Sequence, residues 1–399
     1  MVTPSEASHS TIDRHVAGCF YCGQLGPYTD EHVVSAGLGG DDSAWMLRGC
    51  VCTTCNNTTF SRMEANVLKA SHVGLMRLFA QPTTRDGLPP SPLQAPTTVE
   101  LGADLPHASG SFGAGGQASL FAQIIFEDFT SNEVRFSILG PDRPSVEVLL
   151  SSLHELLQEE VVLIQKHDAR SFSLTRLVLM STGYQSIEVT DVQKPPQTGI
   201  WFEPMRAAGT AEAPPAWTVF RRQTGQLVGR VPELTHLIIL LSQLRPNLDR
   251  VHREFANTTV LPSKVQPLVH MGMTVDMNAV DRVMIKIGLN LIAHLFGVDV
   301  VRQAPFDAAV AFVLGEGESV RRAQLPSTIM RMAPAGRHLF RLTMCRVDDE
   351  RYVLLLTVRL YDAGPVTSFV LAEFASKEPP VQTATVLVDY SANRIERVS

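Results

Sequence analysis

The chain has 399 residues, of which 45% are hydrophobic and 19% are charged. This balance is typical of a globular protein with two or three domains, and it excludes a disordered or collagen-like chain. With 34 basic and 40 acidic residues the formal net charge is −6, so no broad cationic surface indicates nucleic-acid binding. No basic-then-apolar leader opens the sequence and no apolar run approaches the roughly 18 residues of a membrane span. We therefore expect a cytoplasmic protein without membrane contact.

Five of the six cysteines fall within residues 19–55, a clustering that favours metal binding over a disulfide framework in a reducing compartment. Two CxxC pairs separated by 29 residues contain four of them: Cys19, Cys22, Cys52 and Cys55. Each pair brings two thiolates onto one ion, and Gly23 supplies the positive φ that such a turn often needs. Four sulfurs close a tetrahedral shell, so we predict a structural zinc ion with no open position for substrate. Cys50, on the same side of an extended backbone as Cys52, is an alternative ligand.

A carboxylate and a histidine lie between the two pairs, in the sequence TDEHVVSAGLGG of residues 29–40. After the second pair, Asn56 precedes apolar residues at helical spacing, namely Phe60, Met63, Val67 and Ala70. The combination of CFYCG, EHVV with LGG, and CTTCNN resembles the HNH endonuclease family, in the branch where Asn follows the second cysteine pair. The resemblance covers about residues 15–75. Glu64, in the expected helix, is either a solvated carboxylate or a further member of the site.

The resemblance implies a ββα-metal module in which His32 ends the first strand, a Gly-rich turn leads to the second, and a helix begins at the second cysteine pair. It also implies roles for individual residues. His32 is the general base that deprotonates water, and Glu31 and Asn56 hold a catalytic Mg²⁺ or Mn²⁺ ion, with Asp30 and Asn57 as alternates. A hydrated Mg²⁺ ion needs only one or two such protein ligands besides the substrate phosphate. The implied reaction is phosphodiester hydrolysis.

Two features of the hairpin depart from the family pattern. Successive side chains of a strand point to opposite faces, so Asp30 and His32 share one face while Glu31 points away unless the strand ends or bulges there. The commonest HNH pattern also has a middle Asn in the second strand, which braces the loop carrying the base. This chain has Met46 or Leu47 there.

The rest of the chain is mixed in its patterns. Residues 81–118 are rich in Pro and Gly and are predicted as a linker. Alternation predicts strands in FAQIIFEDF and EVRFSIL, and a helical period predicts a helix in SVEVLLSSLHELLQEE. Residues 194–217, again rich in Pro and Gly, are a surface loop or a subdomain boundary. Apolar residues at helical spacing from Val280 to Leu295 predict a core helix that ends near Gly297.

The predicted fold class is α+β, with a zinc-bound ββα-metal module at residues 1–80 and a larger mixed domain at residues 119–399. Within that domain, residues 338–398 contain four apolar strand-like runs separated by turn signals, which predicts an antiparallel meander. Four histidines follow no spacing rule and are assigned no chemistry: His236, His270, His294 and His338.

The function expected from these residues is that of a metal-dependent HNH endonuclease acting on DNA. Acidic residues outnumber basic ones within residues 1–80, so tight DNA binding requires a homo-oligomer, an activating ligand or a protein partner. Residues 119–399 would supply that regulation, as in an effector of bacterial antiviral defence. The alternative is a zinc-knuckle module that binds nucleic acid or protein without catalytic activity.

Overall fold

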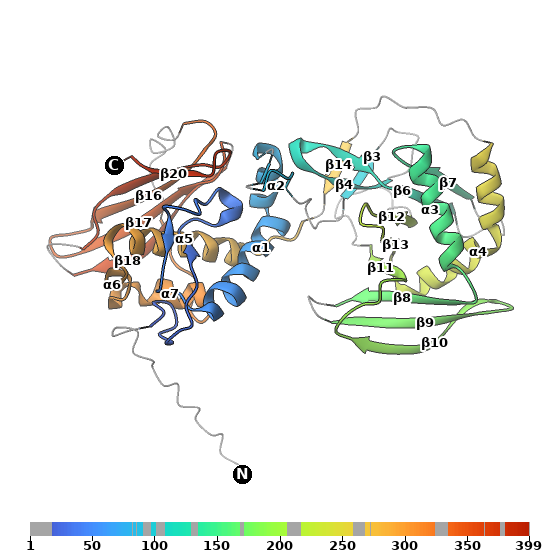
Figure 1. Cartoon of the computed structure of the whole chain (residues 1–399), viewed down its shortest axis with the longest axis horizontal. Helices are drawn as coiled ribbons and strands as arrows, with labels where there is room; N and C mark the ends of the chain where they lie inside the picture. The colour runs from blue at the N-terminus through green and yellow to red at the C-terminus, as the bar shows by residue number, and fades with distance from the viewer. Residues whose placement is uncertain are drawn as a thin grey trace, which may run out of the picture. The chain divides into compact units, whose positions relative to one another are not determined.

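A computed structural model of the chain describes residues 18–81, 83–84, 86–90, 97–100, 108–128, 135–167, 171–205, 217–257, 268–271, 273–323, 334–362, 364–375 and 380–398 (Figure 1). The chain forms two compact units. Unit one comprises Met1–Gln94, Gly113–Gly116 and Met273–Ser399, and unit two comprises Ala95–Phe112 and Gln117–Gly272. The division differs from the predicted one, because the amino-terminal module and the carboxy-terminal third share a single hydrophobic core.

The amino-terminal part of unit one is a short hairpin followed by helices. Strands β1 (Glu31–His32) and β2 (Met46–Leu47) are antiparallel, with η1 (Ala36–Leu38) between them. Gly39 ends η1 with a φ of 86°, and a Cβ there would lie 2.7 Å from the Cα of Tyr390, so the turn needs glycine for both conformation and space. The second cysteine pair leads into a π-helical turn, η2 (Thr54–Phe60), which continues as α1 (Ser61–Ala70) and then α2 (His72–Ala80).

The carboxy-terminal part of unit one packs helices on an antiparallel sheet. The helices are α5 (Met277–Phe296), α6 (Val298–Val301), η4 (Ala304–Phe306) and α7 (Asp307–Leu314). The strands are β15 (Arg322–Ala323), β16 (Arg337–Arg346), β17 (Tyr352–Arg359), β18 (Val366–Phe374), β19 (Ala384–Asp389) and β20 (Arg394–Arg397). Gly288 allows α5 to approach the sheet, since a Cβ there would lie 2.6 Å from a methyl carbon of Leu356.

The predicted antiparallel sheet and core helix are confirmed, but the strand order is not that of a simple meander. The order is β15-β18-β17-β16-β19-β20, so β19 pairs with β16 and not with β18. The α5 helix ends at Gly297 as expected, where φ is 99°. The chain is thus a mixed α/β protein with a cysteine cluster near its start and an antiparallel sheet near its end.

Unit two contains a mixed sheet of eight strands, in the order β10-β9-β8-β11-β13-β12-β6-β7. Its strands are β6 (Ala122–Asp128), β7 (Arg135–Leu139), β8 (Glu160–Lys166), β9 (Phe172–Met180), β10 (Gly183–Val192), β11 (Ile200–Pro204), β12 (Trp217–Arg221) and β13 (Leu227–Val231). Helices α3 (Arg143–Leu156) and α4 (Leu234–Ala256) share the core of this unit. A four-stranded sheet comprises β14 (Leu268–Met271), β3 (Thr97–Glu100), β4 (Ala108–Phe112) and β5 (Ala118–Leu120).

Two stretches predicted as irregular contain strands. The predicted linker 81–118 includes β3, β4 and the first residue of β5, together with η3 (Ala114–Gly116). The stretch 194–217 includes β11, a central strand whose Ile200 is fully buried between parallel β8 and β13. Its residues 206–216 lie outside the described part of the chain. Among the helices that the structure describes, none is both long and apolar enough to cross a membrane.

Candidate metal centre and the neighbouring histidine

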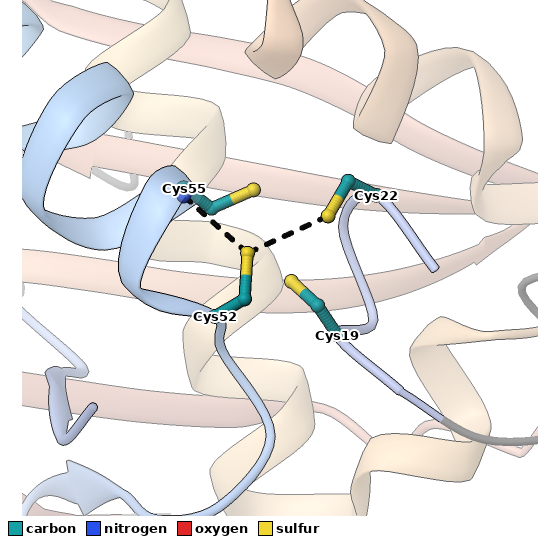
Figure 2. Close-up of side chains that lie close together, drawn as sticks. All are labelled: Cys19, Cys22, Cys52 and Cys55. Atoms are coloured by element: carbon teal, nitrogen blue, oxygen red, sulfur yellow. Dashed lines mark hydrogen bonds between the residues drawn. The ribbon is translucent and has the colours of Figure 1, made fainter. Parts of the chain in front are cut away.

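The four cysteines of the two CxxC pairs form one cluster, with their sulfur atoms all within 4.8 Å of one another. Figure 2 shows the four sulfurs converging, Cys19 and Cys22 from the first turn and Cys52 and Cys55 from the start of the helical segment. The Sγ atoms of Cys22 and Cys52 are 3.6 Å apart. Zinc–sulfur bonds of about 2.3 Å in a tetrahedron place sulfurs roughly 3.8 Å apart, so this geometry fits a zinc ion.

Backbone hydrogen bonds shape the first turn around the cluster. The amide of Gly23, whose φ is 74°, donates to the carbonyl of Cys19 over 2.7 Å. The amide of Phe20 donates to the carbonyl of Cys50 over 3.1 Å, which joins the two cysteine pairs. Arg302 of α6 donates to the carbonyl of Gly18 over 2.8 Å. The first cysteine turn is therefore fixed by contacts from both the amino-terminal and the carboxy-terminal part of unit one.

Cys50 lies outside the cluster. It is not a member of the group of four, and burial raises the pKa of its thiol to about 11. A hydrogen bond from Cys55 lowers the pKa of the Cys19 thiol to about 5. Burial also raises the pKa of the Cys22 thiol to about 11, so the proximity of the four sulfur atoms identifies the ligand set.

His32 lies at the end of β1, opposite Met46 of β2. Its Nε2 atom is 2.5 Å from Oδ1 of Asp42, and the side chains of His32 and Asp42 are 26% and 57% exposed. A carboxylate accepts, so Nε2 carries the proton of this hydrogen bond and Nδ1 is the acceptor of the neutral ring. The structure therefore gives the predicted base an orienting carboxylate that the sequence analysis did not identify.

Asn56 lies beside the start of β1. Its Nδ2 donates to the carbonyl oxygen of Asp30 over 2.9 Å and to the hydroxyl of Thr29 over 3.1 Å. The Asp30 carboxylate is exposed and lies 3.7 Å from Nε of Arg48. Asn57, the other alternate, is exposed on the helical segment. In these contacts Asn56 acts as a brace for the strand that carries His32.

Glu31 points away from His32, as strand alternation predicts. It is 3% exposed and forms an ion pair with the buried ammonium of Lys286, on α5. The carboxylate of Glu64 binds the same ammonium over 2.5 Å and accepts a hydrogen bond from Ser35 over 2.6 Å. Glu64 is therefore neither a solvated carboxylate nor a neighbour of the His32 imidazole. It belongs to a buried ion cluster.

The charges of this cluster follow from burial and proximity. Burial opposes the charge on Lys286, but the carboxylates of Glu64 and Glu31 outweigh it and raise the pKa of the amine. Burial raises the pKa of the Glu31 carboxyl, although Lys286 opposes that shift. A divalent cation at Glu31 would face this ammonium, so the residues do not fit the predicted catalytic cation. Across the described residues, the four cysteines are the one group of three or more His, Cys, Asp or Glu side chains gathered closely enough for a metal ion.

Helix α5 supplies polar residues that the sequence analysis assigned to the core without a role. Lys286, Asn290 and His294 are spaced four apart in a helix that is otherwise buried and largely apolar. Oδ1 of Asn290 accepts from the Tyr21 hydroxyl over 2.6 Å, and Nδ2 donates to the carbonyl oxygen of His32 over 2.9 Å. The ring of His294 stacks on Trp45, with centroids 4.7 Å apart, and burial lowers its pKa. In the sequence, the signal for a role of these residues was the recurrence of a polar residue every four positions in an otherwise apolar helix.

The remaining three of the four histidines that the sequence analysis left unassigned receive no role here. His338 is fully buried in the carboxy-terminal sheet, and His236 lies on α4 in unit two. The side chain of His270 lies outside the described part of the structure.

Comparison with known proteins gave no matching family model, no matching curated protein and no matching solved structure. The cysteine cluster is compatible with a zinc site by its own geometry.

Proposed function

We propose that the chain is an endonuclease of the HNH type that hydrolyses phosphodiester bonds of DNA, with His32 as the general base. The observation that carries this proposal is the partly exposed imidazole of His32, held by Asp42 at the end of a hairpin strand that lies in sequence between the two cysteine pairs. A phosphodiester needs a base to deprotonate the attacking water, and a histidine oriented by a carboxylate is suited to that task.

The hydrogen bond to Asp42 defines which ring atom acts. With Nε2–H donating to Asp42, Nδ1 takes the proton from water. Asp42 then stabilises the imidazolium that forms, because its negative charge is 2.5 Å away. General-base catalysis of this kind contributes about 10² to 10⁴ in rate.

The cysteine cluster has a structural part in the proposal. Zinc held by four thiolates has no open position, so it would fold the turn that carries Tyr21 and the start of η2 without touching substrate. Structural zinc contributes on the order of 10 kcal/mol or more to folding in small zinc-binding peptides. Asn56 directly follows Cys55, the last of the four cysteines. The zinc site would thereby hold Asn56 where it hydrogen-bonds the carbonyl of Asp30, two residues before His32.

The family resemblance also implies a catalytic Mg²⁺ or Mn²⁺ ion held by Glu31 and Asn56. The ion pair of Glu31 with Lys286 and the bracing contacts of Asn56 do not support that ligand set. The proposed proton transfer uses His32 and Asp42, and assays with Mg²⁺, Mn²⁺ and EDTA test whether a divalent cation is required.

The test uses the full-length, zinc-loaded chain with plasmid, linear duplex DNA, single-stranded DNA and RNA, each with Mg²⁺, with Mn²⁺ and with EDTA. We expect DNA cleavage that falls at least about 100-fold in His32→Ala, with zinc content unchanged. His154→Ala replaces an exposed histidine of unit two and serves as the matched control, with wild-type cleavage expected. Equal cleavage by wild type and His32→Ala would remove His32 as the base.

A second candidate function is a zinc-knuckle module that binds nucleic acid or protein without catalysis. The neutralisation of Glu31 by Lys286 favours it, because it occupies the carboxylate that the resemblance assigns to the catalytic cation. If wild type and His32→Ala both bind DNA and neither cleaves it under any of the cation conditions, this second function is favoured over the nuclease.

A further inference from the structure

A fully satisfied polar network connects helix α5 to the β1–β2 hairpin. Asn290 is fully buried, and both of its Nδ2 protons are used, one on the carbonyl of His32 over 2.9 Å and one on Oε1 of Glu31 over 3.3 Å. Its Oδ1 accepts from the hydroxyl of Tyr21. The amide is therefore fixed from three directions, and one of them is the backbone of the proposed base.

The ammonium of Lys286 contacts the same strand through the carboxylate of Glu31. It is 1% exposed, it is paired with Glu31 and Glu64, and it lies 5.2 Å from the centre of the Phe60 ring. Tyr21 packs its ring on Phe60 with centroids 4.6 Å apart. The same short helix segment thus contacts the cysteine turn, the strand β1 and the helical segment after the second cysteine pair.

Asp42, in the loop of the hairpin, contacts the His32 imidazole, but the strand pairing that fixes the His32 backbone is short. Strands β1 and β2 have two residues each, and the residue opposite His32 is Met46, whose side chain has no hydrogen-bond donor. A two-stranded hairpin is marginally stable by itself. Contacts from outside the hairpin must therefore set the position of the His32 backbone.

We propose that Asn290 and Lys286 are positioning residues: they fix β1 through the His32 carbonyl and the Glu31 carboxylate, and so hold the His32 imidazole at Asp42. Asn290 thus supplies, from the carboxy-terminal part of the chain, the brace that the second hairpin strand lacks. This inference rests on the proposed function for its catalytic meaning. Its structural claim, that α5 fixes β1, is independent of that function.

Two measurements on full-length, zinc-loaded protein test the inference. Hydrogen–deuterium exchange followed by mass spectrometry reports the backbone of residues 28–35, where the amide of Val33 donates to the carbonyl of Trp45 over 3.0 Å. We expect Asn290→Leu to accelerate exchange there at least about tenfold. In the cleavage assay, kcat should fall by about 10- to 100-fold while KM stays within about twofold, because substrate contacts are kept and the base is displaced.

Three further variants separate positioning from general destabilisation. Tyr21→Phe keeps the edge-on ring contact with Phe60 and removes only the hydroxyl that orients Asn290, so it should give a smaller effect of the same kind. Added to Asn290→Leu, it should have almost no further effect. The matched control is Asp281→Asn, since Asp281 lies on the same helix. This change breaks the 2.7 Å ion pair of Asp281 with Arg322 of β15. It should leave both exchange at 28–35 and kcat unchanged.

The outcomes are distinct. Unchanged exchange at residues 28–35 in both Asn290→Leu and Tyr21→Phe overturns the inference, as does faster exchange with an unchanged kcat. If Asn290→Leu does not fold, Tyr21→Phe alone decides by the same two measurements. If the wild type cuts no substrate, the proposed function is wrong. Hydrogen–deuterium exchange then decides by itself whether α5 fixes the position of β1.

Discussion

The side chain of Asn290 donates a 2.9 Å hydrogen bond to the backbone carbonyl of His32, across 258 positions of the sequence. This contact joins two segments that the sequence analysis assigned to different domains. It makes the hairpin with the proposed base and the helix α5 parts of one folding unit, with one core.

A fragment of residues 1–80 should not fold independently. Buried residues of this segment, among them Tyr21 and Phe60, share their core with α5 and the carboxy-terminal sheet. Their exposure in the fragment would leave an apolar surface with no partner. We expect poorly dispersed amide signals in an NMR spectrum of the zinc-loaded fragment. A well-dispersed spectrum with protected amides would show an autonomous module and contradict the shared core.

Full-length protein should contain about one zinc ion per chain by elemental analysis. Cys22→Ser and Cys52→Ser, whose sulfurs are 3.6 Å apart in wild type, should each lose the zinc and lower the stability of unit one. Cys50→Ser provides the matched control, because Cys50 lies outside the cluster of four. Loss of zinc in Cys50→Ser with retention in Cys52→Ser would mean that Cys50, and not Cys52, is the zinc ligand.

Lys286→Met should destabilise unit one by about 3 to 5 kcal/mol, because it leaves the buried carboxylate of Glu31 and the partly buried carboxylate of Glu64 without their cation. Adding Glu31→Gln should recover part of that loss by removing one uncompensated charge. Arg394→Met breaks an exposed pair with Glu396 in the same unit and should change stability far less.

Trp45 reports the stability of unit one specifically. It is the tryptophan of that unit, while Trp201 and Trp217 belong to unit two. Denaturant unfolding followed by Trp45 fluorescence, in a background with both other tryptophans replaced by Phe, measures the free energies that the Lys286 prediction needs. A Lys286→Met variant as stable as wild type would mean that the ion cluster is dispensable.

Unit one should lose stability on mild acidification through His338. Burial, with a smaller contribution from Arg359, lowers the pKa of His338 to about 3, and Nδ1 accepts from the amide of Tyr361 over 3.0 Å. Between that value and the ordinary histidine pKa of about 6.5, the unfolded chain binds a proton that the folded chain does not. Stability from this group is therefore complete above about pH 6.5 and falls as pH falls, by up to about 1.4 kcal/mol per pH unit.

The variant His338→Phe isolates the contribution of His338 to the pH dependence of stability. It is expected to be less stable at pH 7, because the Tyr361 amide loses its acceptor, but to have a shallower dependence on pH between about 4.5 and 6.5. Both proteins share any acid-driven loss of zinc, so the difference in slope belongs to His338. Parallel slopes would mean that His338 is protonated in the folded protein.

The sequence predicted the features that local spacing determines. Two CxxC pairs bring four sulfur atoms together in a cluster that is compatible with a zinc site, and the apolar period through Phe60, Met63 and Val67 produces a helix directly after them. The helix from Met277 to Phe296 and the antiparallel pairing near the end of the chain follow from equally local patterns. Strand alternation also predicted that Glu31 and His32 point to opposite faces.

Long-range partners were outside the reach of those patterns. No local rule indicates that Lys286 reaches Glu31, or that Asp42 of the Gly-rich loop turns back onto His32. Strand β11 was missed because Pro and Gly flank its apolar core, although Ile200 is fully buried. These contacts come from chain topology, which relates segments that are distant in sequence.

Chemical rescue tests the role of His32 most directly. The variant His32→Gly removes the imidazole and leaves a space at the end of β1, next to Asp42. We predict that zinc-loaded His32→Gly cleaves plasmid DNA at least about 100-fold more slowly than wild type and that added imidazole restores a measurable part of the rate. The restored rate should rise with the concentration of neutral imidazole. Cleavage by His32→Gly at the wild-type rate, or a loss that imidazole does not reverse at any pH, would contradict general-base catalysis by His32.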